Sequence, residues 1–202
     1  MRKLLGLTVV LAALCVCAPS YGYILVYKVT GGMKAVEWNS GKIISVSVKG
    51  YAAIDINDSN EAIDDKQIVL YGKDASGSLK YYEDSLAKVS LFQVASVVEL
   101  DVWDYNSPFF YEFVMTGNVK LTDIGASSKE LAASSLSGSL ITWWAQLLDS
   151  SQELFGSGAA TMTLDTTQTK AANQGSLSVD AVISAFIAGL EAKGYQPIVL
   201  PS

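Results

Sequence analysis

Alternation of apolar and polar residues is clearest between residues 88 and 125. In the second half of this stretch most odd-numbered positions from 109 to 121 are apolar, and most even-numbered positions between them are polar. A period of two is what a β-strand needs when one face meets a core and the other meets water. Turn-forming residues, from Asp104 to Pro108, separate the two halves. The pattern therefore predicts one long antiparallel hairpin.

Shorter segments rich in β-branched and aromatic residues predict further strands at residues 23–30, 33–38, 43–56, 67–71, 78–82 and 159–167. Gly31 and Gly32 predict a bulge or bend between the first two of these segments. Residues 138–148 fit a strand or a helix, because a short apolar run cannot be assigned by its period alone. Residues 169–175 are polar, and we interpret them as a linker.

One helix is predicted, over residues 178–193. Ser178 is a suitable N-cap, and Asp180 suits the positive N-terminal end of a helix. Apolar residues recur on one face at helical spacing, namely Val179, Val182, Ile183, Phe186 and Leu190. Gly194 and Pro197 then mark its end.

The predicted fold is mainly β: one domain over residues 23–202, an antiparallel barrel or sandwich with a single C-terminal α-helix. A faint internal echo adds one alternative. Residues 29–34 resemble residues 115–120, and residues 70–72 resemble residues 154–156 at a similar offset. An internally duplicated strand set would explain the echo, and so would the chance recurrence of strand-and-turn composition.

The N-terminus has the pattern of a secretory signal peptide over residues 1–22. A basic start, Arg2 and Lys3, precedes an apolar run and small residues at Ser20 and Gly22. We expect a secreted or periplasmic protein with no transmembrane span after cleavage. Cys15 and Cys17 suggest a lipid anchor as the alternative, which the bulky residue before each cysteine disfavours.

Charge and composition exclude several functions. The chain has 14 Lys and Arg against 20 Asp and Glu, which disfavours nucleic acid as a partner. It has no His, and both cysteines leave with the signal peptide. Triad catalysis, His-ligated metals and thiol chemistry are then excluded. We expect a protein that is not an enzyme and needs no cofactor.

Carboxylates are the remaining catalytic candidates. Glu99 and Asp101 share one face of the hairpin, with Trp103 next along it. Paired acids beside an aromatic ring are typical of glycoside hydrolases. A solvated strand face has the same composition, and we favour that interpretation.

An acidic loop follows residue 54 and offers oxygen ligands for calcium. The weak candidates are Asp55, Asn57, Asp58 and Asp64. The loop fails the helix–loop–helix calcium pattern, because Asn60 replaces the required Gly and Lys66 the bidentate Glu. An ordinary solvated loop is the simpler interpretation.

Aromatic residues are the best candidates for ligand binding. Trp103 is one, and of the adjacent pair Trp143 and Trp144 one must point away from the core if the segment is a strand. Six tyrosines that could stack on sugar rings or line a cavity, or equally fill a β core, are Tyr23, Tyr27, Tyr51, Tyr71, Tyr81 and Tyr82.

We therefore expect an exported, non-enzymatic protein that binds an apolar or carbohydrate ligand, or a surface partner. The first alternative is a structural or cell-surface protein without a small-molecule site. The second is a carboxylate-based hydrolase.

Overall fold

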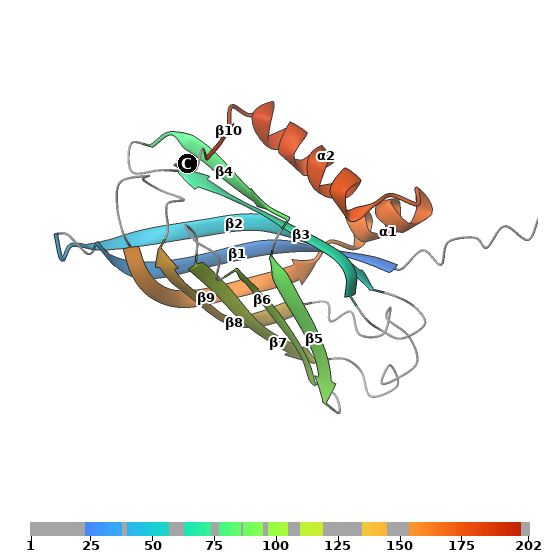
Figure 1. Ribbon diagram of the computed structural model, residues 1–202, viewed down its shortest axis with the longest axis horizontal. Helices are drawn as coiled ribbons and strands as arrows, with labels where there is room; N and C mark the ends of the chain where they lie inside the picture. Colours follow the sequence, from blue (N-terminus) through green and yellow to red (C-terminus); the bar gives the residue numbers. More distant parts are fainter. Residues whose placement is uncertain are drawn as a thin grey trace, which may run out of the picture.

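The computed structural model describes residues 23–37, 40–56, 63–73, 77–85, 87–94, 97–104, 110–118, 135–144 and 154–198. These residues form ten strands and two helices (Figure 1). The strands are β1 (Tyr23–Glu37), β2 (Ile43–Ile56), β3 (Ile63–Lys73), β4 (Leu79–Asp84), β5 (Lys88–Val94), β6 (Val97–Asp104), β7 (Phe110–Asn118), β8 (Ser135–Trp144), β9 (Leu154–Leu164) and β10 (Gln196–Pro197). The helices are α1 (Thr166–Gln174) and α2 (Val179–Glu191). The predicted signal peptide lies outside the described residues.

All ten strands belong to one sheet, in the order β10-β4-β3-β2-β1-β9-β8-β7-β6-β5. Two antiparallel meanders, β1–β4 and β5–β9, are joined where β1 pairs with β9, from Tyr27 with Leu164 to Glu37 with Leu154. The only parallel pairing among the described strands is β10 with β4. The prediction of a mainly β, antiparallel fold is confirmed.

The sheet is open, so the predicted barrel is wrong, and the described strands include no second sheet that would make a sandwich. It curls until β5 approaches β3, but β5 is hydrogen-bonded to neither β3 nor β4. At the edge of β4, β10 pairs with Lys80 and Tyr81, and the backbone N–H of Ile198 donates to the carbonyl of Tyr81 at 2.9 Å.

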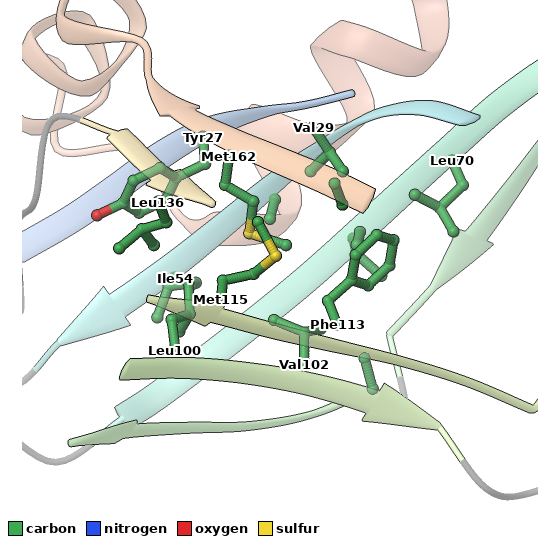
Figure 2. Packing of buried hydrophobic residues seen from close by; sticks show 14 of the residues in the cluster. Tyr27, Val29, Ile54, Leu70, Leu100, Val102, Phe113, Met115, Leu136 and Met162 are labelled. Carbon is green, nitrogen blue, oxygen red and sulfur yellow. The ribbon is translucent and has the colours of Figure 1, made fainter. Parts of the chain in front are cut away.

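The main core fills the concave side of the curled sheet (Figure 2). Side chains from both meanders meet there, and the largest fully buried ones include Leu25, Ile54, Leu70, Leu100, Phe113, Met115, Leu136 and Met162. Interleaved residues of β1–β3 point to the opposite side, where Ile24, Val26, Ala53 and Val69 form a second core with the helices. Both faces of these strands are therefore buried around these residues, which explains the short continuous apolar runs at residues 23–27, 51–54 and 68–71.

The first half of the predicted long hairpin is two strands. β5 and β6 pair from Lys88 with Trp103 to Val94 with Val97, and β6 pairs in turn with β7. The predicted pairing of β6 with β7 is confirmed. The prediction of one continuous strand over the first half of the hairpin is wrong. Between β5 and β6 the sequence has Ala95 and Ser96, of which only Ser96 is a common turn former, so the turn signal is weak.

Gly31 and Gly32 do not form a bulge, because the β1 register runs without interruption against both β2 and β9. They accommodate close neighbours instead. A Cβ added at Gly31 would lie 3.2 Å from the carbonyl oxygen of Ala159.

Residues 138–144, which the sequence pattern left open between strand and helix, lie in β8. The predicted internal duplication is tested by neither strand order nor register and stays a prediction.

Two helices follow β9, so the prediction of a single helix is wrong. The second, α2, begins and ends as predicted: the Ser178 side chain accepts from the backbone N–H of Ala181, and Gly194 has a φ of +87°. The first, α1, occupies most of the segment interpreted as a linker. Its sequence is polar, and only Thr169 and Ala172 are buried, so it lacks an apolar period.

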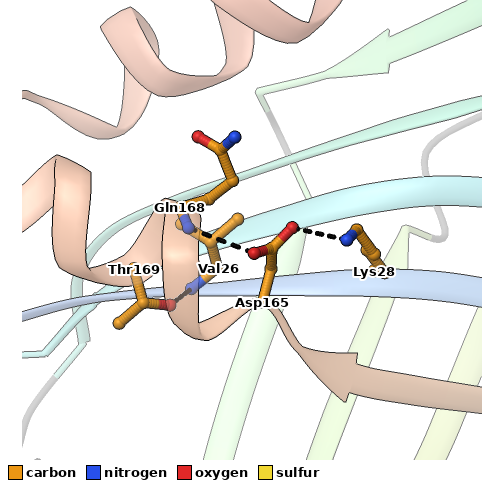
Figure 3. A network of polar contacts seen from close by, with 5 residues as sticks. All are labelled: Val26, Lys28, Asp165, Gln168 and Thr169. Atoms are coloured by element: carbon orange, nitrogen blue, oxygen red, sulfur yellow. Dashed lines mark hydrogen bonds and ion pairs between the residues drawn. The ribbon is translucent and has the colours of Figure 1, made fainter.

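Helix α1 completes the hydrogen bonding of β1 where β9 ends (Figure 3). The Thr169 hydroxyl accepts from the backbone N–H of Val26 at 3.0 Å. One turn later, the Asn173 side chain accepts from the N–H of Ile24 at 3.0 Å and donates to its carbonyl at 2.8 Å. Side chains spaced four residues apart on a helix thus take the place of a strand partner.

Candidate functional site

A groove of about 290 Å³ lies between α2 and the outer face of β2 and β3. Tyr51 of β2 and Tyr71 of β3 point into it, because they alternate with the residues that face the concave core. Phe186 of α2 and Tyr195, just after the helix, form its other wall. We call these four residues the aromatic groove.

The rings of the aromatic groove pack against one another. Tyr51 and Phe186 are stacked, with centroids 3.8 Å apart and planes 6° apart. Tyr71 meets the edge of Tyr195 at 5.3 Å, and Tyr51 lies 6.4 Å from Tyr71. All four side chains remain half-buried, so part of each ring faces solvent.

The end of α2 brings Tyr195 to the groove. Gly194 adopts the left-handed conformation, which reverses the chain at low steric cost. The N–H of Tyr195 then donates to the carbonyl of Leu190 at 3.1 Å, and β10 attaches the next residues to β4. Tyr81 secures the same turn, since its hydroxyl donates to the Glu191 carboxylate at 2.8 Å. Burial and this contact raise the pKa of Tyr81 to about 12.

Gly189 contributes no side chain to the wall that α2 forms along the groove. It lines the groove, and a Cβ added there would meet nothing within 4 Å. A glycine inside a helix lowers stability by roughly 0.5–1 kcal/mol relative to alanine. The position therefore has space for a side chain, and its occupant sets the width of the groove.

Two lysines complete the lining: Lys49 of β2, opposite Tyr71 in the register, and Lys193 after α2. Both are exposed, and no acidic side chain lies among the described residues that line the groove. Burial in this setting raises the pKa of the Tyr71 phenol, so Tyr71 is a neutral hydrogen-bonding group at physiological pH.

A third lysine, Lys28, lies opposite Tyr51 in the register but is engaged elsewhere. Its ammonium contacts the Asp165 carboxylate at 2.7 Å (Figure 3). Burial alone would raise the pKa of Asp165. The hydrogen bonds from Lys28 and from the backbone N–H of Gln168, together with the charge of Lys28, outweigh burial and lower it.

The structure does not bring the predicted tryptophans into the aromatic groove. Trp103 is half-buried on β6, between Lys88 of β5 and Glu112 of β7, and is not among the lining residues. Trp143 and Trp144 lie in β8, but their side chains are outside the described part of the structure. Their role stays a prediction.

Of the six tyrosines singled out in the sequence, Tyr51 and Tyr71 lie in the groove. Tyr81 is buried beneath α2, while Tyr23, Tyr27 and Tyr82 belong to the concave core. Phe186 and Tyr195 were missed as site residues. The first fitted the buried face of the helix, and the second follows the helix end, where the sequence pattern gives no direction for the side chain.

The carboxylate candidates lie on the opposite half of the sheet from the helices, on the outer face of β6. Glu99 is opposite Thr116 and Asp101 opposite Val114. Oδ1 of Asp101 is buried without a hydrogen-bond partner. Burial, and then the charges of Glu99 and Glu112, raise the pKa of Asp101. The hydrolase alternative stays untested.

The calcium candidates are only partly described. Asp55 is half-buried near the end of β2, opposite Asp65, and Asp64 lies in β3. Asn57 and Asp58 lie outside the described residues. Within the described ranges, no group of three or more His, Cys, Asp or Glu residues could hold a metal ion. In the same part of the chain, neither helix is long and apolar enough to cross a membrane.

The fold and groove define a mainly β protein with one open, curled sheet and a helix-covered aromatic groove on its outer face. A scan of protein-family models, a search of curated proteins and a search of solved structures each found no match.

Proposed function

We propose that this protein is an exported, non-enzymatic carbohydrate-binding protein whose site is the aromatic groove. The observation that carries the proposal is the combination of half-buried rings with polar groups in one concave site. Sugar rings present apolar C–H faces, which pack on aromatic rings, and hydroxyl edges, which hydrogen-bond. Tyrosine offers both an apolar ring and a phenol.

The size and lining of the groove suit this role. Ligand sites are typically concave, of about 300–1,000 Å³, and lined by apolar and aromatic side chains with a few polar groups. A groove of about 290 Å³ lies at the lower end of that range. It fits a short part of a saccharide whose remainder extends into solvent.

The composition of the groove supports binding rather than hydrolysis. Glycoside hydrolysis uses two carboxyl groups that flank the scissile bond. The described lining residues include none.

The test is a glycan array of neutral and acidic oligosaccharides, with each hit measured by titration calorimetry. Gly189→Leu should fill the groove and weaken binding at least about tenfold, because its side chain would occupy the ligand's volume. The matched control, Gly189→Ala, should retain affinity and stabilise α2. Absence of any oligosaccharide hit, or equal binding by Gly189→Leu and wild type, would refute the proposal.

A second candidate, a structural or surface-associated role, is favoured by the terminal position of β5 in the open sheet. Buried apolar side chains of the described core also occupy the concave interior. Sheet edges are sites of strand addition between chains. Sedimentation velocity of the purified protein decides this candidate: a discrete oligomer supports it, and a monomer at tens of micromolar contradicts it.

A further inference from the structure

We infer that the saccharide bound in the aromatic groove is acidic and carries carboxylate groups on its rings. The inference rests on the proposed carbohydrate-binding function and narrows the class of ligand. The first observation is the difference in charge between the whole chain and the groove. The chain as a whole carries a formal charge of −6, whereas the described groove lining carries two lysines and no acid.

Both lysines are available to a ligand. Among the described residues, the Lys49 and Lys193 ammonium groups have no ion-pair or hydrogen-bond partner. Lys49 comes from the sheet and Lys193 from the chain after α2, so the two charges reach the groove from different elements. By contrast, Lys28 forms an ion pair with Asp165, and this neighbouring pair adds little net charge to the groove.

Negative groups near the groove are already satisfied. The C-terminal end of a helix carries a partial negative charge from its free carbonyls. At the end of α2, however, the Leu190 carbonyl accepts from the N–H groups of Lys193 and Tyr195, and the Glu191 carbonyl accepts from Gly194. The Glu191 carboxylate accepts from Tyr81 and is not part of the lining. Among the described residues that line the groove, the two lysines therefore supply the only formal charges.

The aromatic rings decide between a sugar acid and a simple anion. An inorganic anion would use the lysines and leave the solvent-facing parts of the half-buried rings of Tyr51, Tyr71 and Tyr195 uncovered. A uronic acid has a ring that can stack and a carboxylate on the ring edge that can accept from an ammonium. A uronic acid therefore matches both the aromatic rings and the lysines of the lining.

The experiment compares saccharides that differ only in charge. Trimers of galacturonic, glucuronic and mannuronic acid, each with its methyl ester, are titrated into wild type and into Lys49→Gln and Lys193→Gln. For at least one trimer the acid should bind about tenfold more tightly than its ester, and each lysine variant should weaken the acid about threefold to tenfold. Binding of the ester should not change. Affinity for the acid should also fall as NaCl rises from 50 to 500 mM, since salt screens exposed charges.

Lys34→Gln is the matched control, because Lys34 is exposed on β1 and is not among the groove lining, and its loss changes the net charge by the same amount. It should leave the affinity unchanged. Four outcomes separate the two proposals. Equal affinity for acid and ester, or equal weakening by Lys34→Gln and Lys49→Gln, overturns the acidic ligand and leaves carbohydrate binding standing. A result in which only neutral oligosaccharides of the array bind also overturns the acidic ligand and leaves carbohydrate binding standing. Failure of every saccharide overturns both.

Discussion

At the scale of single residues, Asp165 links the strands to the helices. Its Oδ1 accepts from the backbone N–H of Gln168 at 3.1 Å and caps α1. Its Oδ2 forms an ion pair with the ammonium of Lys28, and its own backbone N–H donates to the carbonyl of Val26 at 2.8 Å. One residue thus fixes the direction in which the chain leaves β9 and enters α1.

Replacing Asp165 should reveal these contributions separately. Asp165→Ala removes cap and charge and should lower the free energy of unfolding by about 0.5–2 kcal/mol at pH 7. Asp165→Asn keeps a capping oxygen, so its loss should be smaller. Because the pKa of Asp165 is lowered by folding, its ionised form stabilises the protein above its ordinary pKa of about 3.9.

That contribution is lost as the pH falls through the lowered pKa. Urea unfolding at several pH values should therefore show the gap between wild type and Asp165→Asn closing in acid. A gap that is the same at pH 7 and pH 2 would contradict the assigned role of the carboxylate.

At the scale of elements, α1 serves as a hydrogen-bonding partner for β1. The β1–β9 ladder ends at Tyr27 and Leu164, yet Ile24 and Val26 are buried beyond it. Buried backbone groups without partners are costly, so β1 can extend this far only because Thr169 and Asn173 replace the strand. The polar sequence of α1 is a requirement of its position.

Thr169→Val tests this role with little change in shape. Thr169 is buried, and the substitution leaves the N–H of Val26 without its acceptor. We expect a loss of about 1–3 kcal/mol in the free energy of unfolding, measured by chemical denaturation. Thr167→Val, at an exposed position of the same helix, is the control and should have a small effect. Similar losses for both variants would indicate that helix propensity, not the hydrogen bond, is responsible.

The two helices also show what could be predicted from the sequence. Helix α2 was predictable because Ser178, Gly194 and the apolar face mark its start, end and orientation. Helix α1 had one usable signal, Asp165 followed three residues later by Gln168, which resembles a capping box. It was missed because side-chain hydrogen bonds to a distant strand produce no hydrophobic period.

At the scale of the whole molecule, strand composition and alternation were enough to predict the β class, since these depend on neighbouring residues. The open sheet was not predictable, because whether the two ends of the strand order meet depends on the twist and curl of the whole sheet and not on local sequence. The groove was predicted only in part. Tyr51 and Tyr71 were named, but their meeting with Phe186 and Tyr195 requires three separate segments to converge.

The strand order also predicts how stability is distributed. β1 lies inside the sheet with side chains buried on both faces, whereas β5 is the terminal strand. In hydrogen exchange followed by mass spectrometry, β1 amides should open only with global unfolding, and β5 amides should exchange earlier through local opening. Equal protection of the two strands in the monomer would contradict this assignment.

The pairing of β1 with β9 has a consequence for the chain as it leaves the ribosome. β1 is made before the other described strands, but its β9 neighbour is complete only at Leu164. Throughout the intervening synthesis, one side of β1 can pair with β2 and the other has no native partner. A nascent chain stalled before β9 should therefore bind holdase chaperones, and release should coincide with the emergence of β9 and α1.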